Sequence, residues 1–134
     1  MDNLTKETRS KIMRAIKSRD TRPELFVRRA VYSLGYRYRL ADTRLPGCPD
    51  LVFRSRRRVI FVHGCFWHVH RGCPLSHIPP NAYWRKKLKR NVERDKITVN
   101  MLKRSGWKSL VLWECELARA ERLTRRIATF LGSL

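Results

Sequence analysis

Three residues that bind soft metals lie within nine positions of one another, and their spacing constrains the fold more than any other feature of the sequence. They are Cys65, His70 and Cys73. Cys115 follows an apolar run that ends at Trp113, so the edge of a sheet can bring it alongside. Three thiolates and one imidazole give zinc a complete tetrahedral shell with no open position. The sequence therefore predicts a structural Zn²⁺ site with Cys65, His70, Cys73 and Cys115 as its ligands.

Disulfide bonds are the alternative use of these cysteines. The sequence has no secretory signal at its N-terminal end and no run of about 18 apolar residues that could span a membrane. We therefore expect a cytoplasmic protein, in which cysteines suggest metal ligands before disulfides. One disulfide among Cys65, Cys73 and Cys115 would leave a thiol unpaired and His70 without a role. Cys48, which lies in a turn, is left outside the ligand set as a free thiol.

The net charge points to a polyanionic partner. The chain has 31 lysines and arginines against 11 acidic residues, which gives +20 over 134 residues. Such an excess opposes compaction by self-repulsion and usually persists because a polyanion offsets it. The basic residues are spread along the chain rather than gathered on one amphipathic helix, which disfavours a membrane surface. Nucleic acid is therefore the expected partner, and a ribosomal-type or merely soluble basic protein is the alternative.

Hydrophobic periodicity predicts an α/β fold in a single domain, residues 1–134, because 43% hydrophobic residues suffice to bury a core. We expect helices over about 5–17, 21–34, 82–104 and 117–131. Strands are expected over 36–40, 50–53, 59–62 and 109–113. This order predicts a mixed central sheet flanked by helices. The run 59–62 is apolar without alternation, as expected for a central strand covered on both faces.

Local signals mark the ends of the helix over 21–34. Thr21 and Glu24 stand three positions apart, as in a capping box, and Gly35 provides a C-terminal cap.

Asp50 opens a segment that resembles the core of restriction-endonuclease-like nucleases. A carboxylate that starts an apolar strand is costly to bury unless it finds a cation. A simple turn-forming aspartate after Pro49 is the alternative. The acidic second ligand of those nucleases is missing, and Val62 and His63 stand in its place. Val62 offers only its backbone carbonyl.

Five motifs closely resemble those of the very-short-patch-repair (Vsr) mismatch endonucleases. They are RSKIMRAIKSRDTRPE, LPGCPDLVF, VIFVHGCFWHVHRGC, KLKRNVERD and GWKSLVLWEC, in order from residue 9 to about residue 118. Two departures stand out. Arg71 and Gly72 lengthen the spacing between His70 and Cys73, and Cys48 stands where the best-known members have arginine.

The resemblance implies a restriction-endonuclease-like fold that uses Mg²⁺ to nick duplex DNA beside the T of a T:G mismatch. Such mismatches arise when 5-methylcytosine deaminates, so a cytosine-5 DNA methyltransferase is the expected functional companion. We expect a monomer that acts on the nucleoid in the bacterial cytoplasm and has no membrane partner. Two alternatives are a zinc-stabilised nucleic-acid-binding module without catalysis and a nickase or restriction-type endonuclease with another target.

The resemblance also implies a role for each candidate catalytic residue. Asp50 binds Mg²⁺ together with the carbonyl of Val62, and His63 contacts the scissile phosphate. His68 is the general base and Asp95 orients it. Glu24 stands near the metal-bound waters, although a capping box alone would also explain that residue.

The helix over 82–104 supports the role of Asp95 independently. Asp95 fills a gap in the apolar spacing of this helix, which follows Trp84, Leu88, Val92, Val99 and Leu102. A carboxylate on the apolar face of a helix needs a partner. His68 is the favoured partner, and a structural Asp–Arg pair is the alternative.

Phe66 and Trp67 precede His68 in a loop that is otherwise polar. Adjacent aromatics in a loop usually fold inward. The alternative is a wedge that unstacks a base step, which a mismatched step resists less. In the Vsr family the matching aromatics enter from one groove, and a residue matching Met13 enters from the other. Met13 lies in the basic N-terminal segment 1–19, which we expect to contact DNA.

Overall fold

The computed structural model describes residues 20–133, so the expected helix over 5–17 and the segment 1–19 lie outside the described residues. The helices are α2 (Arg22–Ser33), α3 (Ala82–Arg104) and α4 (Ala120–Leu131). The strands are β1 (Arg39–Leu40), β2 (Leu51–Phe53), β3 (Arg58–His63) and β4 (Lys108–Trp113). Three short 3₁₀ segments are η1 (Arg54–Arg56), η2 (Pro74–Ser76) and η3 (Glu114–Arg119).

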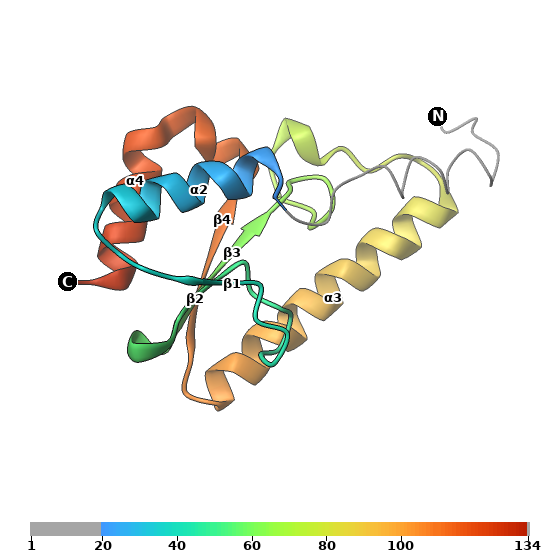
Figure 1. Cartoon of the computed structure of the whole chain (residues 1–134). Coiled ribbons are helices and arrows are strands. Elements are labelled where there is room, and N and C mark those ends of the chain that lie inside the picture. The colour runs from blue at the N-terminus through green and yellow to red at the C-terminus, as the bar shows by residue number, and fades with distance from the viewer. Residues whose placement is uncertain (1–19, 134) are drawn as a thin grey trace.

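The four strands form one mixed sheet in the order β1-β2-β3-β4 (Figure 1). β2 pairs antiparallel with both β1 and β3, whereas β3 and β4 pair in parallel. Ile60 lies opposite Leu51 on one side and Leu110 on the other, so β3 is an interior strand. The predicted α/β fold with a mixed sheet is therefore confirmed.

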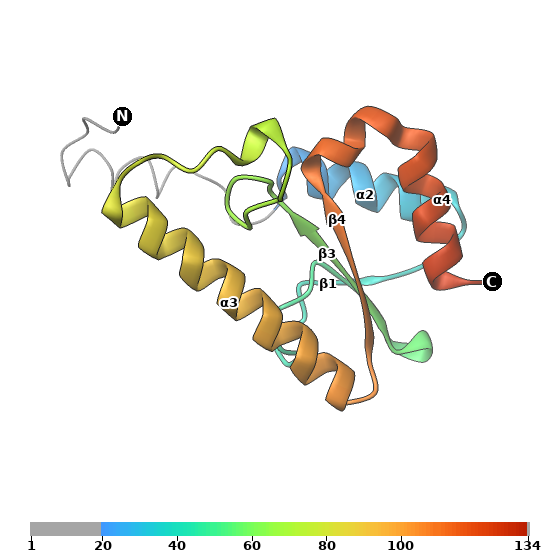
Figure 2. The ribbon, with the colours of Figure 1, turned by 180° about the vertical axis from the view of Figure 1, so that it is seen from behind.

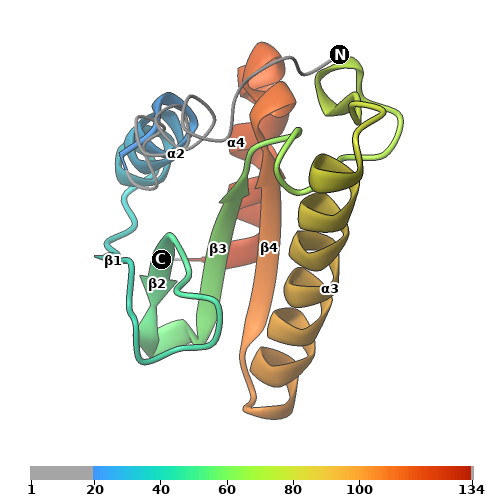
Figure 3. The same cartoon turned by 90° about the vertical axis from the view of Figure 1, so that its right-hand side faces the viewer.

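Helices cover both faces of this sheet, as predicted for a central strand without alternation. Ile60 packs in a core with α2 and α4 on one face, where Val27 and Ile127 are fully buried. Val59 and Phe61 point to the other face and pack with Leu102 of α3. Figure 3 shows α3 alone on one side of the sheet and α2 with α4 on the other.

The start of α2 differs from the predicted capping box in one bond. Thr21 is the N-cap, and its hydroxyl accepts a hydrogen bond from the Glu24 amide at 3.4 Å, as predicted. The Glu24 carboxylate accepts from the amide of Asp20, one residue before the cap, at 2.9 Å. At the other end of α2, Gly35 adopts a φ of +97°, which fits its predicted role as a cap.

Two predicted elements are shorter than expected. The strand over 36–40 is reduced to Arg39–Leu40, because the Tyr36 amide donates to Val31 in closing α2 and cannot join a ladder. The helix over 117–131 begins only at Ala120, since the preceding six residues form η3.

α3 has the predicted bounds and begins at an Asn81 cap whose side chain accepts from the Tyr83 amide. Leu88 and Leu102 are fully buried, while the other apolar positions of its predicted face are half-buried. Figure 2 shows from behind how the loop after β3 leads into α3. Within residues 20–133, no helix combines the length and apolarity that a membrane crossing requires.

A close approach between the loop before β2 and α3 yields a stability prediction. A Cβ on Gly47, whose φ is +74°, would overlap Thr98 Cγ2 and lie 3.3 Å from a ring carbon of Phe61. Gly47→Ala should therefore lower the free energy of unfolding by about 2–5 kcal/mol, through backbone strain plus overpacking. Gly72→Ala is the matched control, since Gly72 has the same φ but nothing within 4 Å. Urea denaturation of both variants measures the difference, and equal losses would show that the loop shifts away from α3.

Candidate metal and catalytic site

The carboxyl ends of the parallel strands β3 and β4 bring the chemistry of the chain together. His63 closes β3 and lies opposite Trp113, which closes β4. Asp50 directly precedes β2, which runs antiparallel to β3 and so starts near the end of β3. The loop that carries the remaining histidines leaves from the same edge. Sequence positions as distant as 50 and 115 therefore meet at one end of the sheet.

Asp50 is a half-buried carboxylate that lies near a second negative charge. Its Oδ2 accepts a hydrogen bond from the Val62 amide at 2.7 Å. Burial raises the pKa of Asp50 to about 6, although this hydrogen bond acts in the opposite direction, and the nearby charge of Glu24 raises it further. Two carboxylates that lie near one another and are partly shielded from water repel each other, and a bound cation would offset this repulsion with their oxygens as ligands.

The Glu24 carboxylate is buried and already accepts two hydrogen bonds. It is 6% exposed, and its Oε2 accepts from the Asp20 amide at 2.9 Å and from Arg28 at 3.3 Å. Glu24 therefore binds the amide before the N-cap instead of completing the predicted capping box, and its charge also reaches Asp50.

His63, His68 and Asp95 form one cluster. The imidazole rings of His63 and His68 stack with centroids 3.7 Å apart and planes within 6°. His68 Nδ1 lies 2.6 Å from Asp95 Oδ2, a hydrogen bond from the loop to α3. Among residues 20–133, the ion pairs of Asp95 involve His68 and not an arginine. The structure thus brings together the pair that the family resemblance implies and gives Asp95 the partner that the helix spacing requires.

These three side chains are close enough to hold a metal ion, with ligand atoms within 4.8 Å of one another. Their geometry favours acid–base work instead. The lone pairs of two stacked imidazoles lie in parallel ring planes and cannot converge on one ion, and His68 Nδ1 is already engaged by Asp95. Only Nε2 of His68 is left to exchange a proton with a solvent molecule.

His63 is held neutral by its surroundings. It is 8% exposed, and burial lowers the pKa of His63 to about 4, with the neighbouring His68 acting in the same direction. Its buried Nδ1 has no hydrogen-bond partner within the described residues. A neutral imidazole can donate one N–H to an anion without adding charge to the site.

Asn91 positions the segment that carries His68, and the sequence reasoning did not single it out. Its side-chain amide donates to the carbonyl of Trp67 at 2.9 Å, while the His68 amide donates to Gly64 at 3.1 Å. Asn91 lies four residues before Asp95 on α3, so the two residues share one helix face. The four-residue spacing between Asn91 and Asp95 was the sequence signal that could have identified Asn91.

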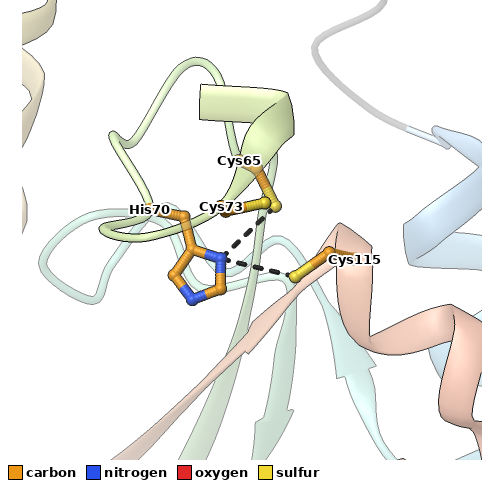
Figure 4. A group of neighbouring side chains, drawn as sticks. All are labelled: Cys65, His70, Cys73 and Cys115. Carbon is orange, nitrogen blue, oxygen red and sulfur yellow. Dashed lines mark hydrogen bonds between the residues drawn. The ribbon is translucent and has the colours of Figure 1, made fainter. Parts of the chain in front are cut away.

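The four predicted metal ligands converge, with their ligand atoms within 4.8 Å of one another (Figure 4). Nδ1 of His70 lies 3.6 Å from Sγ of Cys65 and 3.4 Å from Sγ of Cys115. Burial raises the pKa of the Cys65 thiol, so a bound cation would be needed to hold it as a thiolate. Three sulfurs and one imidazole nitrogen fit a soft, tetrahedral metal ion. Cys48 is exposed and lies outside this cluster, as predicted.

Trp113 joins the metal cluster to the histidine pair, a link that the sequence analysis missed. The ring of His70 stacks on Trp113 with centroids 4.1 Å apart and planes within 6°. The ring of His63 meets Trp113 edge-on at 5.2 Å. The position of Trp113 two residues before Cys115 was the signal that could have placed it here.

Phe66 and Trp67 pack with Trp84 near the start of α3. Ring centroids are 5.5 Å apart for Phe66–Trp84 and 5.7 Å for Trp67–Trp84, and the three side chains are half-buried. The two loop aromatics therefore have an inward contact while part of each ring stays accessible. Met13, the expected partner on the opposite groove, lies outside the described residues.

Comparison with known proteins gives a consistent set of relatives. The family model of the DNA mismatch endonuclease Vsr matches residues 1–74. A type II nicking enzyme of Xanthomonas oryzae pv. oryzae is 44% identical, over 97% of this chain and 96% of the relative. The DNA mismatch endonuclease Vsr of Escherichia coli is 44% identical, over 92% of this chain and 80% of the relative. A type II nicking enzyme of Neisseria meningitidis serogroup A is 40% identical, over 94% of both chains.

The Cys65–His70–Cys73–Cys115 cluster makes a prediction about bound metal. Cys115→Ser should lose the metal that the protein carries, and Tm should fall by more than about 10 °C, since binding free energy at such a site is folding free energy. Cys48→Ser is the matched control, because that thiol is exposed and outside the cluster. Elemental analysis and thermal denaturation of both variants provide the measurement. Equal metal content in the two variants would exclude Cys115 as a ligand.

Proposed function

Because this chain belongs to the Vsr family of DNA mismatch endonucleases, which have a restriction-endonuclease-like fold, we propose that it nicks duplex DNA beside the T of a T:G mismatch. The observation that carries this proposal is the His68–Asp95 hydrogen bond, with the His68 ring stacked on His63 at the sheet edge where the half-buried Asp50 lies. Hydrolysis of a phosphodiester requires a base for water and a group that offsets charge on the phosphate, and these residues supply both.

The cation in this proposal is Mg²⁺. Carboxylate and carbonyl oxygens are its preferred protein ligands, and Asp50 with the backbone carbonyl of Val62 supplies them. The raised pKa of Asp50, caused by burial and by the charge of Glu24, is the condition that a divalent ion would relieve. When bound, Mg²⁺ supplies a Lewis acid for the charge that develops on the phosphate. Glu24 contributes negative charge to the same region.

Proton transfer in this proposal runs through His68. Its Nδ1 is held by Asp95 at 2.6 Å, so Nε2 accepts the proton of the attacking water. Asp95 fixes the tautomer and stabilises the imidazolium that forms. His63 stays neutral and donates to the scissile phosphate, because a second positive imidazole in stacking contact would oppose protonation of His68.

The sulfur-rich cluster is proposed to bind Zn²⁺ in a structural role. With four protein ligands the ion has no open position for substrate. The loop between β3 and α3 is mostly exposed or half-buried and lacks an apolar core of its own. A metal ion would replace that core and hold His68, which lies between two of the ligands in sequence.

Phe66, Trp67 and Met13 are the proposed contacts with the mismatched step. The two rings are half-buried beside Trp84, close to the residue that receives the proton. Insertion of an apolar wedge unstacks a base step for a few kcal/mol, and a mismatch lowers that cost. The wedge would therefore select the substrate as well as expose the backbone.

The proposed cellular setting follows from the substrate. A T:G mismatch results from deamination of 5-methylcytosine, so the enzyme would work where a cytosine-5 DNA methyltransferase has modified the chromosome. We place it in the bacterial cytoplasm on nucleoid DNA, acting as a single-domain monomer.

A nicking assay with Asp50→Asn tests the proposal. Duplexes that carry each mismatch are incubated with Mg²⁺ or with EDTA, and binding is measured on the same DNA. Asp50→Asn should slow nicking of the T:G duplex by on the order of 10²-fold or more and leave the Kd largely unchanged. Asp42→Asn is the matched control, because within residues 20–133 the ion pairs of Asp42 involve Arg44 and Arg54 and none of the candidate catalytic residues. Mismatch binding by wild type without nicking would favour a non-catalytic binding module.

A double-mutant cycle tests the pairing of His68 with Asp95. His68→Ala should lower the single-turnover rate by roughly 10²–10⁴-fold. Asp95→Asn should slow the same step by releasing the imidazole, yet add little to His68→Ala, because residues that act as a unit are non-additive. Glu93→Gln, an exposed change on the same helix, should leave the rate unchanged. If the two losses multiply, Asp95 does not act through His68.

A further inference from the structure

A cavity lies beside the Cys65–His70–Cys73–Cys115 cluster. Its volume is about 480 Å³, and it is lined by His70, Trp113, Cys115, Glu116, Arg119, Arg122 and Arg126. Of the four metal-cluster residues only His70 and Cys115 take part, so the cavity extends from the cluster toward η3 and α4. Three arginines against one glutamate make its lining strongly positive.

Two of these arginines have no acidic partner within residues 20–133. Arg126 of α4 is paired with Glu116 of η3, whose other oxygen accepts from the Trp113 amide at 3.1 Å, so these two contacts join α4 and η3 to the end of β4. Arg119 and Arg122 are exposed, and within residues 20–133 neither forms an ion pair. Two unpaired guanidinium groups at the rim of one cavity favour an anionic ligand.

His70 offers a third donor to the same cavity. Its Nδ1 faces the sulfurs of Cys65 and Cys115, and Figure 4 shows its other ring nitrogen directed away from them. Within the described residues, Nε2 makes no hydrogen bond. A ring that uses one nitrogen for a metal ordinarily donates from the other. Donors from the loop, from η3 and from α4 therefore surround the cavity.

The position of the cavity near the candidate catalytic residues favours a phosphate of the DNA as its anionic ligand. Trp113 separates it from the candidate catalytic residues, because this ring stacks on His70 at 4.1 Å and meets His63 at 5.2 Å. Successive phosphates of a DNA strand are about 3.4 Å apart along the helix axis. A duplex with one phosphate at His63 thus has further phosphates within reach of the cavity.

We infer that this cavity binds a backbone phosphate of the DNA, near the one that is cut, through Arg119 and Arg122. This inference rests on the proposed function, since it requires DNA at the His63–His68 pair. The contact reads no base and fixes the register of the duplex on the enzyme. It also gives the unpaired charges of Arg119 and Arg122 a role that the catalytic residues do not explain.

Salt dependence of DNA binding tests the inference. Kd is measured by fluorescence anisotropy on a T:G duplex between roughly 50 and 200 mM salt, where each phosphate contact contributes about −0.9 to the log–log slope. The zinc-loaded double variant Arg119→Gln/Arg122→Gln should have a slope shallower by about 1, equivalent to roughly a 3.5-fold smaller loss of affinity over that range. Arg104→Gln/Arg125→Gln removes the same charge outside the cavity and should keep the wild-type slope.

A chemical change in the DNA locates the contact. Uncharged methylphosphonate linkages are placed one at a time along each strand near the mismatch. One position should make the wild-type slope shallower by about 1 and leave the slope of Arg119→Gln/Arg122→Gln unchanged. Arg119→Lys/Arg122→Lys should restore the dependence on that linkage, because lysine also binds phosphate as a point charge.

The outcomes separate this inference from the proposed function. A wild-type protein whose affinity for DNA is independent of salt would contradict the proposed function itself. A steep wild-type slope, with equal slopes for the cavity variant and the Arg104/Arg125 control, would overturn only the cavity assignment. In that case an acidic protein partner would be the alternative ligand of Arg119 and Arg122. Metal content and Tm of each variant verify that it is folded.

Discussion

The parallel pairing of β3 with β4 is the constraint on which the rest of the structure depends. Its register sets His63 opposite Trp113 and thereby brings Cys115 to the loop that carries Cys65. A parallel pair requires a long crossover, and α3 supplies it while covering the sheet face around Val59 and Phe61. The same helix carries Asp95 to His68. One pattern of backbone hydrogen bonds therefore supports the metal cluster and the candidate proton-transfer pair together.

This edge of the sheet has two regions that favour ligands of opposite charge. Burial and the charge of Glu24 raise the pKa of Asp50, so that region favours a cation. The cavity near η3 has unpaired arginines and favours an anion. Burial lowers the pKa of His63, so this residue is neutral and adds no positive charge between the two regions. A polyanionic substrate with its own divalent ion satisfies both regions at once, whereas either ligand alone satisfies one.

Much of this arrangement could be predicted from the sequence, because ligand spacing and helix periodicity depend on local geometry. The spacing of Cys65, His70 and Cys73 predicted the cluster, and the gap at Asp95 predicted a partnered carboxylate. The remainder depends on tertiary contacts. Tyr36 closes α2 instead of extending β1, and η3 replaces the first turns of the last predicted helix. The stacking of Trp113 on His70 and the cavity beside it arise only when β4 and the loop meet.

The shared ring of Trp113 has a consequence for anyone who wishes to redesign this nuclease. His70 stacks on Trp113 and His63 meets the same residue edge-on, so the three rings pack together as one unit. Grafting the loop onto another scaffold would have to transplant that unit whole. Gly72 is no exception, because a Cβ there meets nothing within 4 Å but its φ of +74° disfavours any other residue, and Cys73 follows directly. Labels or added modules are therefore best attached outside residues 65–73, where they would disturb neither the ring contacts nor the converging ligands.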